Sequence, residues 1–522
     1  MTPTTTATHD HSSAPEPPRG ELGPLHDLAH AEATAPDRPL LAWREGEWTV
    51  AEFAAAARSA AAELHDAGVR AGDRVALMAT NSAASLAATY GVWMLGAVEV
   101  AVNAELKGPL LAHVLRDSAP ALLVVSATLA DTAALQAPQL STLVLEELRL
   151  DRSWTPPGTL PGPGDLASLL YTSGTTGPSK GVMIPHGYFS YFASVLASVL
   201  ELGPDDTCYF TLPFFHVDAH IAVPTSLRRG SRMAFVERFS VRRFWSDVEH
   251  FGATWFGAVG SMLSALATQD APPAAALDRL RVILAAPIPS DAYAFFEDTL
   301  QVPLLQMYGQ TEANGPIYST LDRRRRGAMG WARADFDLRV VTVEGADVEP
   351  GQVGELLTRP RREHIRAQGY WRAPEATATA FADGWFRTGD LVRCDADGFW
   401  YYAGRCSDSL RRRGENISAF ELEAVMRTAP GVRECAAVAV RDELGGEDDI
   451  KAVLVASDGF DPGTFVAHCR AQLPRFALPR YLELVDEHRL VRGPGTGAVQ
   501  KHLLPSGLTA ATVDLEDLGT PN

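Results

Sequence analysis

Short apolar runs alternate with Ala-rich segments of helical period along most of the chain. The intervening segments Val50–Ala67 and Arg243–Phe251 are typical of helices. This alternation predicts an α/β fold with largely parallel sheets. The runs rich in aliphatic and β-branched residues, which predict buried strands, are Arg74–Met78, Ala121–Val125, Thr142–Leu145, Met233–Val236 and Arg281–Leu284.

The longest apolar stretch, Leu86–Val102, is interrupted by Thr89, Tyr90 and Glu99. It is shorter than a segment that spans a bilayer. We therefore expect a buried helix that runs into a strand, and no membrane span.

The pattern restarts near Phe420, and 522 residues exceed what one compact core usually holds. A small α+β domain is predicted at the C-terminus. Its expected elements are a helix at Phe420–Met426, strands at Cys435–Val440 and Lys451–Val455, a helix at Thr464–Leu473 and an apolar segment at Tyr481–Val485.

Charge and cysteine content narrow the possible partners. The 46 basic and 64 acidic residues give a net charge of −18, which argues against nucleic acid as a partner. A nucleotide such as ATP would need backbone N–H donors and a few well-placed cations. The five cysteines are widely spaced and form no CxxC pair, and the first twenty residues contain no apolar leader. A cytoplasmic protein is expected.

The segment Tyr171-Thr-Ser-Gly-Thr-Thr-Gly-Pro-Ser-Lys-Gly-Val182 follows the predicted strand Leu166–Tyr171. Its glycines allow close approach to an anion, its hydroxyls donate hydrogen bonds and its lysine neutralises phosphate charge. The Walker pattern GxxxxGK[ST] is absent. The predicted phosphate loop consists of Thr172, Ser173, Gly174, Thr175, Thr176, Gly177 and Lys180.

This segment resembles the signature loop of the adenylate-forming superfamily, which includes acyl-CoA synthetases, luciferases and peptide-synthetase adenylation domains. A second run, Gln306–Glu312, is similar to the YGxTE motif of that family. The resemblance implies that Tyr308 stacks on adenine, Thr311 contacts the α-phosphate, and Glu312, together with Thr175, holds Mg²⁺. The nucleotide-binding residues of this run are Tyr308, Gly309, Gln310 and Thr311.

Two further motifs complete the implied nucleotide site. Gly384–Asp390 resembles the family's GWxxTGD, so Asp390 is expected to bind the ribose hydroxyls, and Arg405 opens a GRxxDxIKxxGExI-like segment and is expected to contact phosphate. Taken alone, Asp390 would be typical of a turn carboxylate. Relatives carry a Gly-Gly-Ala-Pro-like turn beside the adenine, and the matching residues here are Leu284, Ala285, Ala286 and Pro287.

The run Phe214-Phe215-His216 matches an aromatic-His element that borders the acyl pocket in relatives, although a core histidine is an alternative for His216. Leu284 would narrow this pocket. The expected substrate pocket is Phe215, His216, Val259, Leu284 and Gly309, and the expected CoA-side residues are Arg411, Gly414 and Glu415.

The sequence contains two runs of arginine, for which we predict different roles. Residues 411–413 would face either the CoA 3′-phosphate or solvent, whereas the run 323–326 is interpreted as a solvated surface loop.

The resemblance implies a large N-terminal adenylate-forming domain of stacked sheets and helices and a small mobile C-terminal α+β lid. The segments Asn103–Gly108 and Arg413–Ser418 place the chain closest to the fatty-acid and carnitine/crotonobetaine CoA ligase branch. A homodimer is left open. The expected bounds are a disordered tail at 1–20, the AMP-binding domain at 21–404, a hinge at 405–408, the lid at 409–505 and a second disordered tail at 506–522.

The chain departs from the family at one catalytic position. Relatives read roughly PxGKxxK near the C-terminus, and this chain has Ala498 at the first lysine and Lys501 at the second. In the family that first lysine reaches the carboxylate and the α-phosphate in the transition state. Its absence predicts adenylation that is slower by about 10²–10³, with ATP binding retained. Drift in an arginine-rich chain would more readily give Arg, so we interpret Ala498 as a deliberate replacement of lysine.

The function that follows is an ATP- and Mg²⁺-dependent, AMP-forming ligase that activates a small acid and transfers it to an acceptor, by default CoA. One alternative is a relative that activates nitrite and forms a diazo group on an amine. Another takes Ala498 as natural and the chain as a non-catalytic nucleotide-binding protein. The retained Lys180, Glu312 and Asp390 argue against the last reading.

Overall fold

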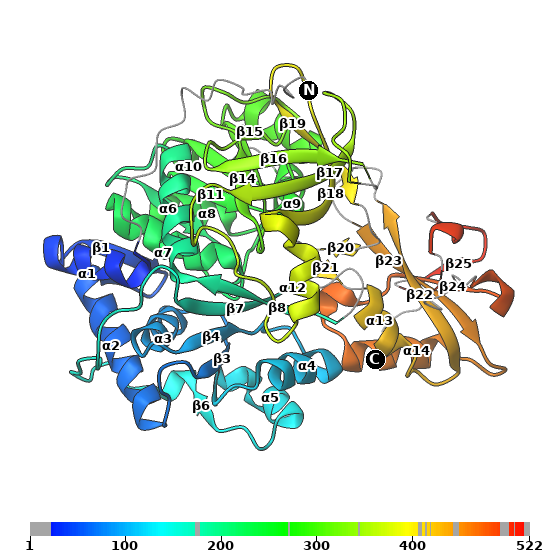
Figure 1. The fold of residues 1–522 in the computed structure, drawn as a ribbon, viewed down its shortest axis with the longest axis horizontal. Coiled ribbons are helices and arrows are strands. Elements are labelled where there is room, and N and C mark those ends of the chain that lie inside the picture. The colour runs from blue at the N-terminus through cyan, green and yellow to red at the C-terminus, as the bar shows by residue number, and fades with distance from the viewer. Residues whose placement is uncertain are drawn as a thin grey trace, which may run out of the picture.

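The computed structural model describes residues 22–172, 178–269, 272–342, 345–405, 410–412, 415–417, 419–441, 448–490, 499, 501–505 and 507–515. Two parts of unequal size are visible in Figure 1, a large one and, at the right, a small one that contains β22 to β25. Helices and strands alternate through the large part. The predicted α/β class with a large N-terminal and a small C-terminal domain is confirmed.

A six-stranded sheet forms the base of the large domain, with the order β6-β5-β3-β4-β7-β8. Neighbouring strands are parallel except in the β7–β8 hairpin. The hairpin therefore closes one edge of the sheet and projects the loop between its strands. The strands are β3 Arg74–Met78, β4 Val98–Ala101, β5 Leu122–Val125, β6 Thr142–Val144, β7 Leu166–Thr172 and β8 Lys180–Pro185.

A nine-stranded sheet has the order β15-β14-β13-β12-β11-β9-β10-β1-β2, and the run from β13 to β1 is parallel. Parallel strands bring their carboxyl ends to one edge, where loops carry function. The strands are β1 Pro39–Trp43, β2 Gly46–Thr49, β9 Thr207–Phe210, β10 Arg232–Phe235, β11 Trp255–Ala258, β12 Val282–Ala285, β13 Leu304–Gln310, β14 Asn314–Tyr318 and β15 Trp331–Ala332.

The helices α3 and α6 are almost entirely buried, because they contribute to the largest apolar cluster of the domain. α3 leads into β4, as predicted for Leu86–Val102. No helix in the described ranges is long and apolar enough to cross a membrane. The helices are α1 Pro24–Thr34, α2 Val50–Asp66, α3 Ala83–Met94, α4 Gly108–Ser118, α5 Ala130–Gln136, α6 His186–Val199, α7 Val217–Arg229, α8 Phe244–Phe251, α9 Gly260–Ala267, α10 Ala274–Leu277, α11 Ser290–Ala292 and α12 Pro374–Ala380.

A third, antiparallel sheet completes the large domain and consists of β16 Phe336–Val341, β17 Gly354–Pro360, β18 Phe386–Cys394 and β19 Trp400–Arg405. The arginine run 323–326 lies in the connection between β14 and β15, next to the β18–β19 loop of this sheet, and is exposed, as expected. Arg325 pairs with Asp395 and Asp397 at 2.8 Å, and Arg326 pairs with Glu297 at 3.0 Å. These ion pairs neutralise the charge of the two arginines and connect their loop to neighbouring surface segments.

The small domain is built on one mixed sheet of the order β22-β23-β24-β25, with a separate β20–β21 hairpin. Apolar residues of α13, α14 and this sheet form its own core. The predicted helices and strands of this region are confirmed, although β22 and β23 are longer than expected. The elements are β20 Leu410–Arg412, β21 Glu415–Ile417, α13 Ala419–Met426, β22 Val432–Arg441, β23 Asp448–Ala456, α14 Pro462–Gln472, β24 Tyr481–Leu484 and β25 Thr512–Asp514.

The prediction of a disordered tail at 506–522 is wrong for residues 507–515. β25 pairs with β24, and Leu515 is buried. Lys451, fully buried, donates to the Gly507 carbonyl at 2.8 Å and pairs with Glu483 at 2.9 Å. The sequence of this acidic tail alone predicts no structure, because the groups that it contacts, the buried Lys451 and the edge of the sheet at β24, lie elsewhere in the sequence.

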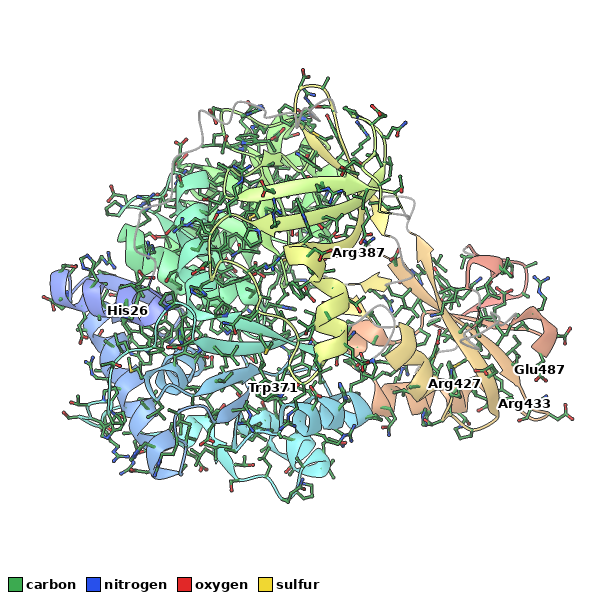
Figure 2. All side chains as sticks on the ribbon, in the orientation of Figure 1. His26, Trp371, Arg387, Arg427, Arg433 and Glu487 are labelled. Atoms are coloured by element: carbon green, nitrogen blue, oxygen red, sulfur yellow. The ribbon has the colours of Figure 1, made fainter. Side chains whose placement is uncertain are left out.

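The two domains meet beside the phosphate loop. Ser179 N donates to Glu421 of α13 at 2.6 Å, and Lys107 Nζ donates to the Arg470 carbonyl of α14. Figure 2 shows Arg433 at the outer end of the small domain, away from this junction. α13 and α14 therefore face the large domain.

Candidate functional site

The β7–β8 hairpin delivers the predicted phosphate loop. Its last strand pair places Thr172 opposite Lys180, so the chain leaves and re-enters the sheet at one point. A backbone turn of this kind can present successive N–H groups to an anion. The loop residues Ser173, Gly174, Thr175, Thr176 and Gly177 lie outside the described residues.

Glu312 lies against this hairpin and is only 8% exposed. One of its carboxylate oxygens, Oε1, accepts hydrogen bonds from the Thr172 hydroxyl at 3.0 Å and the Tyr370 hydroxyl at 3.1 Å. Lys180 Nζ lies 5.6 Å from the centroid of the Tyr370 ring. Three segments far apart in sequence thus meet at what we call the phosphate end, defined by Thr172, Lys180, Glu312 and Tyr370.

The chemistry of the phosphate end fits Mg²⁺ that arrives with a nucleotide. Magnesium usually takes one or two protein carboxylates and fills its remaining positions with phosphate oxygens and water. Glu312 supplies one such carboxylate. In the described part of the chain, no group of three or more His, Cys, Asp and Glu side chains forms an independent metal site. The metal role of Thr175 stays a prediction.

A second polar cluster joins β13 to β18 through Tyr308, Gln310 and Asp390, and we call it the ribose end. The Tyr308 hydroxyl donates to Asp390 Oδ2 at 2.7 Å. Gln310 Nε2 donates to the same oxygen at 2.5 Å and to the Thr388 carbonyl at 2.9 Å. Asp390 is 2% exposed, so its position is tightly fixed. The structure therefore brings together the predicted runs Gln306–Glu312 and Gly384–Asp390.

Tyr308 and Asp390 were expected to contact adenine and ribose, respectively, and those ligand contacts stay predictions. The Tyr308 ring packs in a buried cluster with Ile317 and Trp400. In the β18–β19 pair, Asp390 lies directly opposite Arg405. The Arg405 backbone is described, whereas its side chain is not.

The adenine-side residues also lie together. β11 and β12 pair in register, with Ala258 opposite Ala285, and Ala286 N donates to the Ala258 carbonyl at 3.4 Å. Val259 therefore lies next to Ala286, ahead of α9. Pro287 follows the carboxyl end of β12, and Thr311 follows that of β13. Gly309 lies in β13, next to its last residue. Leu284 is buried in the largest core cluster.

His216 precedes α7 and is half-buried, and its ring lies 4.5 Å from that of Phe215, centroid to centroid. The core histidine of this segment is His220, one helical turn later and 5% exposed. His220 Nδ1 donates to the His216 carbonyl at 3.0 Å. A second histidine, four residues after the predicted motif, therefore holds the backbone of His216.

The opposite ring nitrogen of His220 pairs with Glu99 of β4 at 2.7 Å. Glu99 also accepts from Thr89 at 2.8 Å and from Ser168 at 2.7 Å. Burial alone would lower the pKa of His220, but the Glu99 carboxylate and its hydrogen bond raise the pKa above its usual value. Burial would raise the pKa of Glu99, but His220 and the two hydroxyls lower it. The pair is therefore held charged.

This buried network links β7, which leads into the phosphate loop, to α7, which begins directly after His216. A cavity of about 20 Å³ lies beside it, lined by Phe214, Phe215 and Trp93 among others. That volume holds about one water molecule. Sequence reasoning missed the network and Tyr370, because single residues on separate elements form no local motif.

Four other predicted residues are described only in part or not at all. Gly414 and Ala498 lie outside the described residues. The backbones of Arg411 and Glu415 lie in the β20–β21 hairpin, but their side chains are not described. The assignment of Arg411, Gly414 and Glu415 to the acceptor side, and of Ala498 to the position of the family lysine, stays a prediction.

Taken together, the two-domain α/β fold and the side-chain clusters at the phosphate and ribose ends indicate a nucleotide-binding enzyme. The family model described as AMP-binding enzyme matches residues 28–371, and the model described as AMP-binding enzyme C-terminal domain matches residues 421–492. The chain belongs to the AMP-binding enzyme family, as the motifs indicated.

Several characterised relatives are CoA ligases. A feruloyl-CoA synthase of Amycolatopsis sp. is 34% identical over 86% of this chain and 91% of its own length. A long-chain fatty-acid CoA ligase of Mycobacterium tuberculosis is 31% identical over 87% and 92%. A crotonobetaine/carnitine CoA ligase of Salmonella paratyphi A is 29% identical over 81% and 86%. The predicted likeness to the fatty-acid and carnitine branch is confirmed.

Solved structures agree with this placement. A double mutant of the o-succinylbenzoate CoA synthetase of Bacillus subtilis, bound to a product analogue, has a TM-score of 0.81 at 25% identity, over 92% of this chain and 98% of that one. The amide bond synthetase of Marinactinospora thermotolerans reaches 0.80 at 25%, with the same coverage. The Bacillus enzyme in complex with AMP reaches 0.68 at 25%, over 92% and 97%.

Proposed function

We propose that this protein activates a small carboxylic acid with ATP and transfers the acyl group to CoA. The observation that carries the proposal is the meeting of Thr172, Lys180, Glu312 and Tyr370 at the phosphate end. A cation, a carboxylate and two hydroxyls at the mouth of a glycine-rich loop match the needs of a triphosphate with its magnesium. The relatives named above act on carboxylic acids, which supports the choice of substrate class.

In the first half-reaction a carboxylate oxygen attacks the α-phosphorus of ATP, the bond to the bridging oxygen of the β-phosphate breaks, and pyrophosphate leaves. Lys180 neutralises phosphate charge, and Glu312 holds the position where bound Mg²⁺ supplies further positive charge. In the second half-reaction the CoA thiolate attacks the acyl carbon, and AMP leaves. The protein acts through positioning and charge, and no covalent enzyme intermediate is needed.

We propose that the small domain is a lid that turns between the half-reactions about residues 405–408, of which 406–408 lie outside the described residues. The same Bacillus enzyme matches this chain better with a CoA product analogue than with AMP, at TM-scores of 0.81 and 0.68. This difference supports a domain arrangement suited to acyl transfer. CoA contacts at Arg411, Gly414 and Glu415 are part of the proposal.

Ala498 should slow the first half-reaction without weakening nucleotide binding. The lysine of relatives acts where negative charge develops, so its absence removes transition-state stabilisation alone. The ground-state contacts of ATP lie on the large domain. We therefore propose a slow enzyme that has a complete nucleotide site. A cytoplasmic location is a further part of the proposal.

ATP–pyrophosphate exchange tests the proposal. The protein and its Ala498→Lys variant are assayed against a panel of aromatic, aliphatic and zwitterionic acids, and AMP release is then followed with CoA. We expect exchange with at least one acid and thioester formation with CoA. Tight ATP binding without exchange for any acid would instead support the non-catalytic alternative.

Nitrite activation is the second candidate, and the observation that favours it is the burial of Leu284 beside the adenine-side turn. A leucine where relatives have glycine leaves less room for an acyl group. The test adds nitrite and an amine to the same exchange assay. ATP-dependent AMP release with nitrite, and none with carboxylic acids, would replace the first candidate with the second.

A further inference from the structure

Residues 211–216 connect β9 of the nine-stranded sheet to α7 and end at the half-buried His216, and we call them the β9–α7 loop. A buried asparagine, Asn81, follows β3 of the six-stranded sheet and contacts this loop. Asn81 Oδ1 accepts from Phe214 N at 2.8 Å, and Asn81 Nδ2 donates to the Leu212 carbonyl at 2.9 Å. One buried side chain therefore satisfies two backbone groups of the loop.

The amide of Asn81 also reaches the neighbouring strand. Its Nδ2 donates to the Val236 carbonyl at 3.2 Å, and Val236 directly follows β10. β9 and β10 pair in parallel, so their carboxyl ends lie at one edge of the sheet. Asn81 thus ties the six-stranded sheet to that edge at the point where the β9–α7 loop begins.

The other end of the loop is held by His220. Its Nδ1 donates to the His216 carbonyl at 3.0 Å, and its Nε2 pairs with Glu99 of β4 at 2.7 Å. The His220 ring also stacks on Phe189, with 5.2 Å between centroids and 19° between planes, so packing fixes its orientation. Glu99 in turn accepts from Ser168 of β7, the strand that leads into the phosphate loop. The backbone of His216 is therefore tied to that strand.

The hydrogen-bond ladder of α7 is interrupted in its middle, where Pro224 lies. Proline has no N–H, so the carbonyl four residues earlier, that of His220, lacks its usual donor within the helix. The first turn of α7 is therefore held less firmly by the helix itself. Phe214 and Phe215 line the cavity of about 20 Å³, which has room for about one water molecule and leaves their rings little space to move.

We propose that three buried side chains position His216 for the acid that is adenylated. They are those of Asn81, Glu99 and His220, and we call them the clasp. The inference rests on the proposed function and deepens it, because it names the residues that set the geometry of the acid site. The clasp acts through His216 and does not act on the nucleotide. Its loss should therefore impair use of the acid and leave nucleotide binding unchanged.

A purely structural role is the simpler alternative, and the opposite end of α7 provides its control. Arg228 in the last turn pairs with Asp27 at 2.6 Å, and both side chains are half-buried. Arg228→Gln and His220→Gln each remove a cationic partner from α7 and leave a carboxylate behind. A structural role predicts that both variants affect activity only through stability. The clasp predicts that His220→Gln alone changes the use of the acid.

The first experiment measures ATP–pyrophosphate exchange with ferulate, decanoate and crotonobetaine in the Ala498→Lys background, below the unfolding transition of each variant. Asn81→Ala and His220→Gln should each lower kcat/KM for an accepted acid by about 10- to 100-fold, because a displacement of about 1 Å can cost 100-fold in rate. The Kd of a non-hydrolysable ATP analogue should stay unchanged. Arg228→Gln should alter neither quantity. Glu99→Gln keeps the side-chain shape and should act in the same direction, which keeps the test valid if His220→Gln folds poorly.

A double-variant cycle then tests whether the clasp acts through His216. If it does, Asn81→Ala and His220→Gln should lower kcat/KM no further in the His216→Ala protein. Fully additive losses would overturn the inference. So would a loss in Arg228→Gln as large as that in His220→Gln, or unchanged kcat/KM in both clasp variants.

Amide hydrogen exchange, followed by mass spectrometry of peptides that cover residues 209–222, tests the clasp without any acid. Exchange in the β9–α7 loop should be faster in Asn81→Ala and His220→Gln than in the parent protein, and unchanged in Arg228→Gln. Equal exchange in all four proteins would overturn the inference alone. Absence of pyrophosphate exchange with every acid in the parent protein would overturn the proposed function itself.

Discussion

The large and small domains differ in which part of the reaction they serve. The large domain holds the phosphate end and the ribose end, and its described residues already form the hydrogen bonds that fix both. The small domain contributes Glu421 at the junction, and the sequence motif predicts that its Ala498 stands at the position of the family lysine. The proposed function thus assigns ground-state binding of the nucleotide to one domain and the missing transition-state group to the other. Nucleotide affinity and turnover can therefore be changed separately.

Each domain also has its own buried ion pair, Glu99–His220 in the large domain and Lys451–Glu483 in the small one. Removing one partner leaves an uncompensated buried charge, which costs about 3–5 kcal/mol. We expect His220→Gln to lower the unfolding transition of the large domain and Lys451→Met that of the small domain, in denaturant unfolding followed by tryptophan fluorescence and limited proteolysis. If both variants lower a single shared transition equally, the two domains unfold cooperatively.

The Glu99–His220 pair also makes stability depend on pH. The folded-state pKa of His220 is raised, so its contribution is complete below the unfolded value near 6.5 and is lost as pH rises through the folded value. The pKa of Glu99 is lowered, so its contribution is complete above about 4.5 and is lost as pH falls through the folded value. Wild type should lose stability relative to His220→Gln above about pH 6.5. A constant difference up to pH 9 would contradict a charged pair.

The separation of binding from turnover predicts the effect of restoring the lysine. Ala498→Lys should raise adenylation by about 10²–10³, or roughly 3–4 kcal/mol of barrier, while the Kd for ATP changes less than about threefold. Single-turnover AMP formation and equilibrium binding of a non-hydrolysable ATP analogue measure the two quantities. Lys501 pairs with Glu423, so Lys501→Ala is a control for a general gain or loss of lid charge. A rise in affinity equal to the rise in rate would show that Ala498 acts in the ground state.

On the large domain, Glu312→Gln should weaken Mg·ATP binding by about 10- to 100-fold, because it removes a charged ligand and keeps the side-chain shape. Binding of the nucleotide without Mg²⁺ should change little, which isothermal titration with and without the metal can show. Glu421→Gln at the domain junction changes a half-buried carboxylate in the same way and, as a control, should leave both affinities unchanged. Equal losses with and without Mg²⁺ would argue for a purely structural role of Glu312.

The smallest effect is expected at Tyr370. Tyr370→Phe keeps the ring beside Lys180 and removes one hydrogen bond to Glu312, which is worth about 1 kcal/mol. Adenylation in the Ala498→Lys background should fall by about fivefold. Tyr370→Leu should cost more, because it also removes the contact between the Lys180 ammonium and the ring. Identical rates for the two variants would limit the role of Tyr370 to the hydroxyl.

The sequence was sufficient for the elements that carry local patterns. The strand Arg74–Met78 was predicted with its observed bounds, and the predicted strand Leu166–Tyr171 before the phosphate loop is one residue shorter than the observed β7. It was insufficient where a role depends on tertiary contact. Tyr370 meets Glu312 across 58 residues, and His220 meets Glu99 across 121. Neither pair has a spacing that hydrophobic periodicity or a short motif could reveal.

The scarcity of lysine has a chemical consequence for an enzyme that makes mixed anhydrides. All four lysines are engaged in the structure: Lys451 is buried with Glu483, Lys501 pairs with Glu423, Lys107 donates to Arg470, and Lys180 lies over Tyr370. Acyl-adenylates and thioesters that escape from a site acylate free amines, and an arginine guanidinium, which stays protonated, is a poor nucleophile. Because arginine replaces lysine almost everywhere, the protein has few amines of its own that the activated product could acylate.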